Sequence, residues 1–530
     1  MNRAAALLLY AAALAGGTYS AYHPVFDSGF GRVRADTCDG MLNHYVLEHS
    51  WRVVSDPGYC GTLLSPPCFY PTPLTLAYSE NLLGTAPIYW GLRLGLPDHL
   101  AYQWWMIACS GMNFAAFAAV ARWLGCGPPA AALGGFLWAF GLVHVTNELH
   151  QQMLPRFWMP VAAYHAWGFA TAPGRRPLNR MLACVFLQAT ACVYTGWFLV
   201  TGLAVFVPAA AAVAPGGWRA VWRYVAADRW GVARVAGGWG LALGVFFSPY
   251  AVAFVGHGRG YAEHAHLVPP PAAWLTGPPG SRRADTVGPC LPYVDGECRL
   301  FSGFGVVALI AAAGLHAAWV WRRPERRPGL RLVAACLATA AAWWLLTVRV
   351  GDEVSAWWLV RFFPGGGAIR CVGRVYLVVY LFGTLGAAAW LQVVADRVRA
   401  GWRRAAVVLL VAAPVAFEQT GFTSPSTPAD DFYPATDRCA ADLRGAAAGY
   451  VVPSVGSARH YGDVFGMWAG LRANVPVVNG YSGREPTGYP EFTQEYDEEL
   501  LRGWLAGKVR GRVRVVDPAH PGEVREVWVE

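Results

Sequence analysis

The sequence predicts a mainly α-helical protein whose helices cross a membrane several times, with a small α/β region at the C-terminal end. Apolar residues make up 55% of the chain and charged residues 14%, a balance that is typical of membrane proteins. The apolar residues also gather in runs that approach the roughly 20 residues needed for a helix to cross the hydrocarbon core. Counting these runs predicts a polytopic bundle of about eleven transmembrane helices.

The expected spans are distributed along the first four fifths of the chain. They are residues 4–22, 100–121, 128–145, 154–170, 181–194, 196–214, 232–255, 301–321, 330–348, 371–394 and 405–417. The fifth and the last are shorter than a full crossing. The first run could instead be a cleaved signal peptide, because it has a short basic start and small residues near its end.

Arginines occupy every second loop between these runs. They are Arg122; Arg175, Arg176 and Arg180; Arg219, Arg223 and Arg229; Arg322, Arg323, Arg326 and Arg327; and Arg397, Arg399, Arg403 and Arg404. Short cytoplasmic loops collect Lys and Arg, so the alternation favours a retained first span, a cytoplasmic N-terminus and a tail outside the cytoplasmic (inner) membrane. Arginines that meet anionic lipid also explain the formal net charge of +9, and no nucleic-acid partner is expected.

The chain is therefore expected to comprise a transmembrane module over residues 1–417 and an extracytoplasmic α/β domain over residues 418–530. Long outer loops are expected at 23–99, 257–300 and 349–370, which places function on that side. In the first of these loops, apolar residues at helical spacing predict a helix over 39–54 and, less clearly, one over 81–94.

The tail mixes signals for helix and strand. Thr436 could cap a helix that runs to about residue 447, and Thr493 could cap another through residue 505. Residues 450–452 and 475–478 are expected to be short strands, and residues 509–516 and 524–529 a closing hairpin.

Two cysteine pairs fall in the expected outer loops. Cys60 and Cys68 are separated by seven residues, as are Cys290 and Cys298. Each pair could close as a disulfide in an oxidising compartment, or remain as two free thiols.

Acidic side chains gather directly after the first span. Asp36 and Asp39 are three residues apart, and Glu80 follows later in the same loop. Two carboxylates at this spacing could share a proton or a divalent cation, whereas no cysteine spacing indicates a zinc site. Helix capping is the alternative for each of the three acids.

The chain resembles the GT-C class of membrane glycosyltransferases. The resemblance lies in a first helix with its N-terminus inside, a large outer first loop with acids at its start, many further spans and an outer C-terminal domain. This resemblance implies a sugar donor carried on polyprenyl phosphate, a lipid, glycan or protein acceptor, and an inverting transfer with an acid of the first outer loop as general base. Asp36, Asp39 and Glu80 are the catalytic candidates. Beyond the carrier-linked sugar no cofactor is implied, although a divalent cation at Asp36 and Asp39 remains an alternative.

The departing carrier phosphate would need cations to hold it. Arg361, Arg370 and Arg374 flank the outer end of a late span, and arginine grips phosphate with paired donors. The alternative is that these side chains reach lipid headgroups.

Further candidates for substrate binding lie in other outer loops. They are His150, Gln151, Arg156, His264, His266 and Tyr481. The functional interpretations are hydrogen bonds to a sugar or headgroup, closure of a loop over the acceptor, and stacking of Tyr481 on a sugar. The alternatives are ordinary loop polarity and, for Tyr481, a turn between strands. A metal held by His144, Glu148 and His150 is a further alternative.

A transporter or flippase of a lipid-linked sugar is the competing function. Such proteins place ionisable residues within their spans, and the expected spans are nearly free of them. A structural membrane protein without activity is a third alternative. The enzyme hypothesis predicts that Asp36 or Asp39 shares a cavity with Glu80 and with an arginine from residues 361–374.

Overall fold

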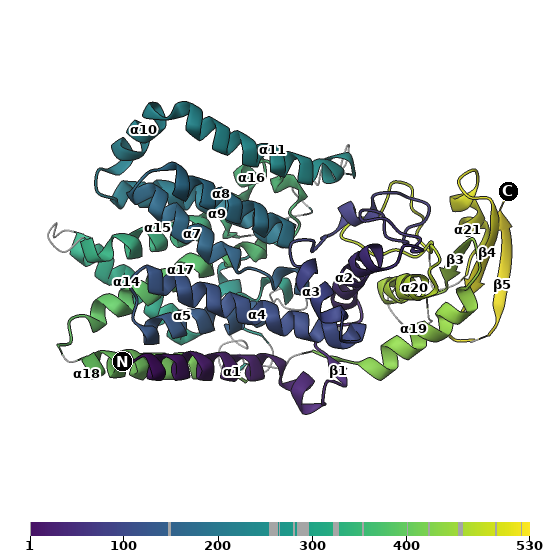
Figure 1. Ribbon diagram of the computed structural model, residues 1–530, viewed down its shortest axis with the longest axis horizontal. Helices are drawn as coiled ribbons and strands as arrows, with labels where there is room; N and C mark the ends of the chain where they lie inside the picture. Colours follow the sequence, from purple (N-terminus) through teal and green to yellow (C-terminus); the bar gives the residue numbers. More distant parts are fainter. Residues whose placement is uncertain are drawn as a thin grey trace.

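The computed structural model of the chain describes residues 2–146, 150–253, 263, 265–278, 281–282, 296–321, 328–351, 355–399, 401–421, 425–453, 459–492, 496–520 and 522–529. Within these residues the protein is mainly helical, with long helices gathered at one end and a small sheet at the other (Figure 1).

Every expected span contains a helix. The long helices are α1 (Arg3–Asp27), α4 (Asp98–Trp123), α5 (Pro128–Phe140), α7 (Trp158–Thr171), α8 (Arg175–Ala191), α9 (Val193–Val213), α11 (Arg229–Ala253), α14 (Phe304–Trp321), α15 (Arg331–Thr347), α17 (Tyr376–Ala395) and α18 (Gly401–Glu418). In the described part of the chain, seven helical stretches are long and apolar enough to cross a membrane. The protein is therefore a helical bundle with the length and composition of an integral membrane protein.

Short elements connect the long helices. They are α6 (Leu142–Thr146), α10 (Gly217–Ala227), α16 (Trp357–Val360), η1 (Thr75–Tyr78), η2 (Gln151–Met153), η3 (Pro271–Trp274), η5 (Gly296–Cys298), η7 (Pro328–Leu330), η8 (Gly366–Ala368) and η9 (Val372–Val375). We call the end of the bundle where α1 finishes the loop end. The opposite end, where Arg122 and Arg397 lie, is called the arginine end. At this end a hydrogen bond from the backbone N–H of Gly127 to Gln392 Oε1, at 2.5 Å, joins the start of α5 to α17.

Small residues let the first helices of the bundle approach closely. A Cβ atom at Gly17 of α1 would overlap the ring of Phe140 in α5, and one at Gly134 would overlap Phe117 in α4. Without a hydrophobic driving force in lipid, helices associate through such close packing. This packing fixes α1, and with it the start of the chain that follows α1 at the loop end.

At the loop end the chain forms α2 (Asp39–Ser55) and α3 (Ala86–Arg93) before it enters α4. The helix expected over 39–54 is confirmed. The helix expected over 81–94 is shorter, because Pro87 begins it: proline suits the first turn of a helix and breaks its interior.

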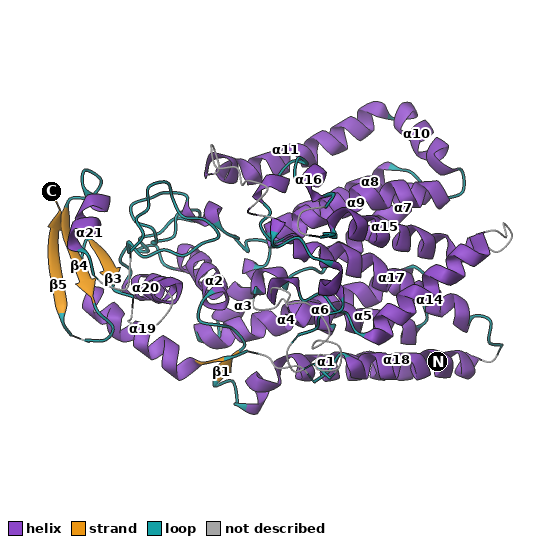
Figure 2. Cartoon of the chain, turned by 180° about the vertical axis from the view of Figure 1, so that it is seen from behind, coloured by secondary structure: helices purple, strands orange, loops and turns teal. Residues whose placement is uncertain are grey.

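The C-terminal segment, residues 425–529, lies beyond the loop end (Figure 2). It contains α19 (Ala429–Leu443), β3 (Ala448–Val451), α20 (Arg459–Ala473), α21 (Glu498–Leu505), β4 (Gly511–Val516) and β5 (Val524–Val529). The strand order is β3-β4-β5. Strand β3 runs parallel to β4, with Tyr450 opposite Val515, and β5 runs antiparallel to β4, with Val527 opposite Val513.

The expected hairpin and the strand near residue 450 are confirmed, but other expectations for the tail are wrong. Thr436 lies inside α19, where its hydroxyl donates to the Tyr433 carbonyl at 2.7 Å, so it caps nothing. Val477 makes an isolated bridge to Gly449 instead of a strand. Thr493 lies outside the described residues, and Asp497 caps α21 by accepting from the Leu500 N–H at 2.9 Å.

The C-terminal segment shares its core with the first long loop, and the expected boundary at residue 418 does not separate them. The indole N–H of Trp468 in α20 donates to the Met41 carbonyl in α2 at 3.0 Å. Phe69 N–H donates to the Asn479 carbonyl at 3.0 Å, and Trp504 Nε1 donates to the Tyr70 carbonyl at 2.9 Å. Both pieces therefore form one unit at the loop end.

A two-stranded ribbon also joins the start of the first loop to the start of the C-terminal segment. Strand β1 (Arg32–Val33) pairs antiparallel with β2 (Thr427–Pro428). The Arg32 guanidinium donates to the Ser426 carbonyl at 2.7 Å. The chain that leaves α1 is thus tied to the chain that leaves α18.

The disulfide alternative is wrong for the pair Cys60 and Cys68, which are free thiols. Cys68 is buried, with its Sγ 3.8 Å from Thr75 Oγ1, whereas Cys60 is exposed and donates its backbone N–H to Asn474 Oδ1. Cys290 lies outside the described residues, so the expected pair Cys290–Cys298 is not described.

Gly480→Ala tests the joint between the first loop and the C-terminal segment. A Cβ atom at residue 480 would overlap the Phe69 ring, so we expect a loss of about 1–3 kcal/mol in stability, the range typical of overpacking. The midpoint of thermal unfolding in detergent, followed by tryptophan fluorescence, should fall. Gly483→Ala is the matched control, since a Cβ there would lie 3.6 Å from the nearest atom, Tyr78 O; an equal shift in both variants would contradict the prediction.

Asp463 gives the C-terminal segment a pH dependence. Burial raises the pKa of this α20 carboxyl to about 7, despite Arg459 Nε at 3.4 Å. The folded protein then keeps a proton that the unfolded chain loses near pH 4, so stability falls as pH rises from about 4 to about 7. We expect Asp463→Asn to unfold at a higher temperature than the wild type at pH 8 and at a similar temperature at pH 4.5. A difference that is the same at both pH values would contradict this.

Candidate functional site

Six polar side chains from five separate segments meet at the loop end, and we call them the acid–arginine cluster. They are Asp39, His150, Glu297, Arg370, Arg374 and Tyr481. Asp39 begins α2, His150 precedes η2, Glu297 lies in η5, Arg374 lies in η9 and Tyr481 follows α20. The cluster therefore lies where the bundle meets the C-terminal segment.

Asp39 is held from two sides. The Tyr481 hydroxyl donates to Asp39 Oδ1 at 2.8 Å, and His150 Nδ1 lies 2.6 Å from Asp39 Oδ2. On its other edge, His150 Nε2 lies 3.7 Å from Glu297 Oε2. The imidazole thus bridges two carboxylates that come from loops more than 250 positions apart in the sequence.

Glu297 links this bridge to the arginines. Arg374 Nη2 lies 3.3 Å from Glu297 Oε2, and Arg370 Nη2 lies 3.4 Å from Glu297 Oε1. The Arg374 guanidinium is buried and lies over the Tyr194 ring, 4.4 Å from its centroid. The Arg370 side chain keeps 47% of its surface exposed. One arginine is therefore fixed in the protein, while the other faces solvent.

The charges of the cluster stabilise one another. Burial raises the pKa of Asp39, but the contacts with His150 and Tyr481 and the field of Arg374 outweigh burial and lower it to about 2. Burial likewise raises the pKa of Glu297, and Arg374 and His150 lower it overall. Both carboxylates are ionised at neutral pH, so Asp39 can accept a proton.

Asp36 and Glu80 have the contacts of the capping alternative. Asp36 Oδ1 accepts from the Gly40 N–H at 2.7 Å, in the first turn of α2, and burial raises its pKa. Glu80 Oε2 accepts from the Val193 N–H at 2.6 Å at the start of α9, and burial raises its pKa too. Among the three predicted acids, Asp39 is the one that lies within ion-pair distance of a histidine, His150, which in turn approaches Glu297.

Gln151 and Arg156 are engaged with the backbone. Gln151 Nε2 donates to the Arg34 carbonyl at 3.0 Å. Arg156 is buried, and its Nη2 donates to the carbonyls of Trp138 at 3.0 Å and Ala139 at 3.1 Å. Because these carbonyls end α5, Arg156 caps that helix in place of the predicted contact with substrate.

Two other predicted residues lie apart from the cluster. Arg361 follows α16, with its guanidinium 5.0 Å from the centroid of the neighbouring Phe362 ring. His266 is exposed. His264 and Glu148 lie outside the described residues. The structure therefore tests neither the closure of a loop over the acceptor nor a metal held by His144, Glu148 and His150.

Sequence reasoning missed Glu297 and Tyr194. Glu297 falls in the expected outer loop 257–300, one residue before Cys298, and no spacing marks it as different from other loop acids. Tyr194 begins α9, and its hydroxyl accepts from the Arg370 N–H at 3.3 Å. The only signal in the sequence for these two residues was their position: Glu297 falls in a long outer loop, and Tyr194 falls at the end of an expected span.

In the described ranges, no group of three or more His, Cys, Asp or Glu side chains is placed to hold a metal ion. A small void of about 10 Å³ lies beside Tyr481, bounded also by Leu42 and Met467. The described residues that line it include neither the predicted acids nor an arginine, so it is not the expected cavity shared by Asp36 or Asp39, Glu80 and a late arginine. No protein-family model matches the chain, and no curated protein matches it. The functional interpretation therefore rests on the geometry of the acid–arginine cluster.

Asp39→Asn should destabilise the protein in a pH-dependent way. The folded-state pKa of Asp39 is about 2, below its ordinary value of 3.8, so its ionised form contributes stability that is complete above pH 4 and is lost as pH falls towards 2. We expect the thermal midpoint of the variant to lie below that of the wild type at pH 6, by an amount that corresponds to about 1–3 kcal/mol, and to approach it as the pH falls towards 2. The exposed Asp431→Asn is the control and should leave the midpoint unchanged at both pH values.

Proposed function

We propose that this chain is an integral-membrane glycosyltransferase of the GT-C type. It moves a sugar from a polyprenyl-phosphate carrier to a lipid, glycan or protein acceptor at the outer face of the membrane, with inversion at the sugar. The observation that carries the proposal is the contact chain from Asp39 through His150 and Glu297 to Arg374 and Arg370, which brings an ionised carboxylate and two cations together at one end of the bundle.

The reaction assigns a separate task to each end of this chain. The acceptor hydroxyl attacks the anomeric carbon of the sugar, and Asp39 takes its proton as the new C–O bond forms. The bond between the anomeric carbon and the phosphate oxygen breaks, and its electron pair leaves with the polyprenyl phosphate. Arg370 and Arg374 stabilise the negative charge that develops on this phosphate.

The arrangement suits a charged donor that enters from solvent or lipid. Arg370 is half-exposed and pairs with Glu297 at 3.4 Å, so an incoming phosphate can compete for its donors. Arg374 stays buried beneath it. His150 holds Asp39 and Glu297 at a fixed separation, so binding of the phosphate and orientation of the base are coupled through one side chain.

The proposed topology has eleven spans, one for each expected segment. Seven are the long apolar stretches, and α7, α8, α15 and α18 supply the others. With the N-terminus in the cytoplasm, an odd number of spans puts the acid–arginine cluster and the C-terminal segment outside, opposite the arginine-rich loops.

Turnover by purified protein reconstituted with radiolabelled polyprenyl-phosphate sugars tests the chemistry. We expect Asp39→Asn to lower kcat by about 10²-fold or more, the usual contribution of a general base. Asp36→Asn is the matched control and should retain most of the turnover, because Asp36 caps α2. Full activity of a folded Asp39→Asn variant, or movement of the lipid-linked sugar across the bilayer without its consumption, would reject the proposal.

An arginine of the cluster and an arginine outside it should differ kinetically. Arg370→Gln is expected to raise the KM for the donor by about tenfold, since a hydrogen bond between charged groups contributes about 1.5–3 kcal/mol, and Arg361→Gln is expected to change it little. Equal effects of both substitutions would indicate a general attraction for anions in place of a specific phosphate site.

Chemical labelling of Cys60 tests on which side of the membrane the first loop lies. It is the exposed one among the described cysteines, although burial of part of the thiol raises its pKa to about 11, so labelling is best done at pH 8.5. We expect a membrane-impermeant maleimide to label intact cells through Cys60 and Cys60→Ser to lose that label. Labelling that requires permeabilised cells would place the first loop in the cytoplasm.

A further inference from the structure

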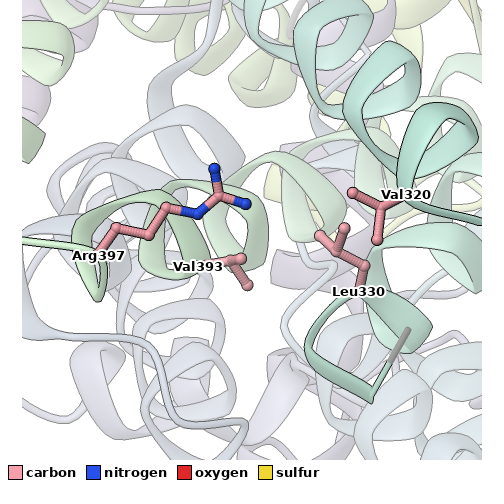
Figure 3. A pocket seen from close by; sticks show the side chains of 4 residues that line it. All are labelled: Val320, Leu330, Val393 and Arg397. Carbon is pink, nitrogen blue, oxygen red and sulfur yellow. The ribbon is translucent and has the colours of Figure 1, made fainter. Parts of the chain in front are cut away.

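The arginine end of the bundle contains a hollow of about 500 Å³ that the proposed reaction does not use. Its walls are Val320 of α14, Leu330 of η7, Val393 of α17 and Arg397, which follows α17. In Figure 3 the Arg397 guanidinium lies on one side of the hollow, and Leu330 and Val320 lie across from it. Among the described residues that line the hollow, three are thus apolar and one carries a cation.

His316, one helical turn before Val320, places a second nitrogen next to this cation. Trp390 Nε1 donates to His316 Nδ1 at 2.9 Å, so the neutral imidazole carries its proton on Nε2. That Nε2 lies 2.9 Å from Arg397 Nη2, which is also a donor because a guanidinium has no acceptor. Two donors therefore face each other at hydrogen-bond distance, an arrangement that an anion accepting from both would stabilise.

The acid next to Arg397 is already engaged elsewhere. Asp396 Oδ1 accepts from Gln392 Nε2 at 2.8 Å and lies 3.5 Å from Arg404 Nη1. Arg404 also donates to the Val398 carbonyl at 2.7 Å. Among the residues that the structure describes around the hollow, this acid therefore does not neutralise Arg397, and an anion from outside the chain would complete the charge there.

The surroundings of the hollow indicate a lipid. Leu315 and Trp319, which flank His316 on α14, expose 74% and 52% of their surface, so an apolar face leads directly from the cation pair onto the side of the bundle. Basic pockets between transmembrane helices are suited to anionic headgroups. A free phosphate ion would use the two donors but none of the apolar walls.

We propose that this hollow binds one anionic phospholipid, whose phosphate accepts from Arg397 and His316 and whose hydrocarbon lies against Val320, Leu330 and Val393. The site lies at the opposite end of the bundle from the acid–arginine cluster and does not depend on the proposed enzymatic activity. Its occupant ties α14 to α17 and thereby stabilises the bundle.

Thermal unfolding of the purified full-length protein in detergent, titrated with lipid, tests the site. Phosphatidylglycerol is expected to raise the unfolding midpoint in a saturable way and to appear as one bound lipid per chain in native mass spectrometry. Phosphatidylcholine and inorganic phosphate are expected to leave the midpoint unchanged. An equal rise with inorganic phosphate would overturn the lipid assignment.

Two variants locate the binding. Arg397→Gln removes the cation, and Val393→Phe narrows the hollow with a bulky ring while leaving Arg397 in place. Each is expected to weaken phosphatidylglycerol binding at least tenfold. Arg399→Gln, an exposed arginine two residues away, is the matched control and should bind like the wild type. Undiminished binding in either folded variant, or an equal loss in Arg399→Gln, would overturn the proposal.

Discussion

The bridge that His150 makes between Asp39 and Glu297 is the interaction on which the loop end depends. Two partly buried carboxylates close to each other would repel and would lose part of their hydration. The imidazole on one side and the two arginines on the other compensate both costs, so the carboxylates stay ionised. Because the five groups come from four distant segments, the electrostatic balance exists only when the loops are folded against one another.

Packing around α2 holds this balance in place. Trp468 reaches from α20 to the Met41 carbonyl, and the ring of His44 lies 4.7 Å from the Trp468 ring. The same C-terminal segment contributes Tyr481, which donates to Asp39. The unit that shields the acid from water is therefore also the unit that orients it, and disturbing the joint should disturb the acid.

Much of the bundle could be predicted from the sequence, because a membrane span is a local property. Each expected run contains a helix, and the helix over 39–54 and the hairpin near the C-terminus follow from periodicity alone. The failures lie where distant contacts decide. Thr436 is a good cap by residue type but lies within α19. Val477 bonds to the backbone of Pro67 and Tyr70 in the first loop and makes an isolated bridge to Gly449 in place of the expected strand.

The sequence by itself determined that acids follow the first span and that arginines flank a late one, since residue type and order are enough to place both near one end of the helices. Only the tertiary structure decided which acid meets which arginine. Asp36 and Glu80 are occupied by backbone N–H groups at helix starts, and Glu297 enters from a loop that no pattern marks. Capping and ion pairing use the same carboxylate oxygens, and the choice between them depends on which donors the folded chain brings within reach.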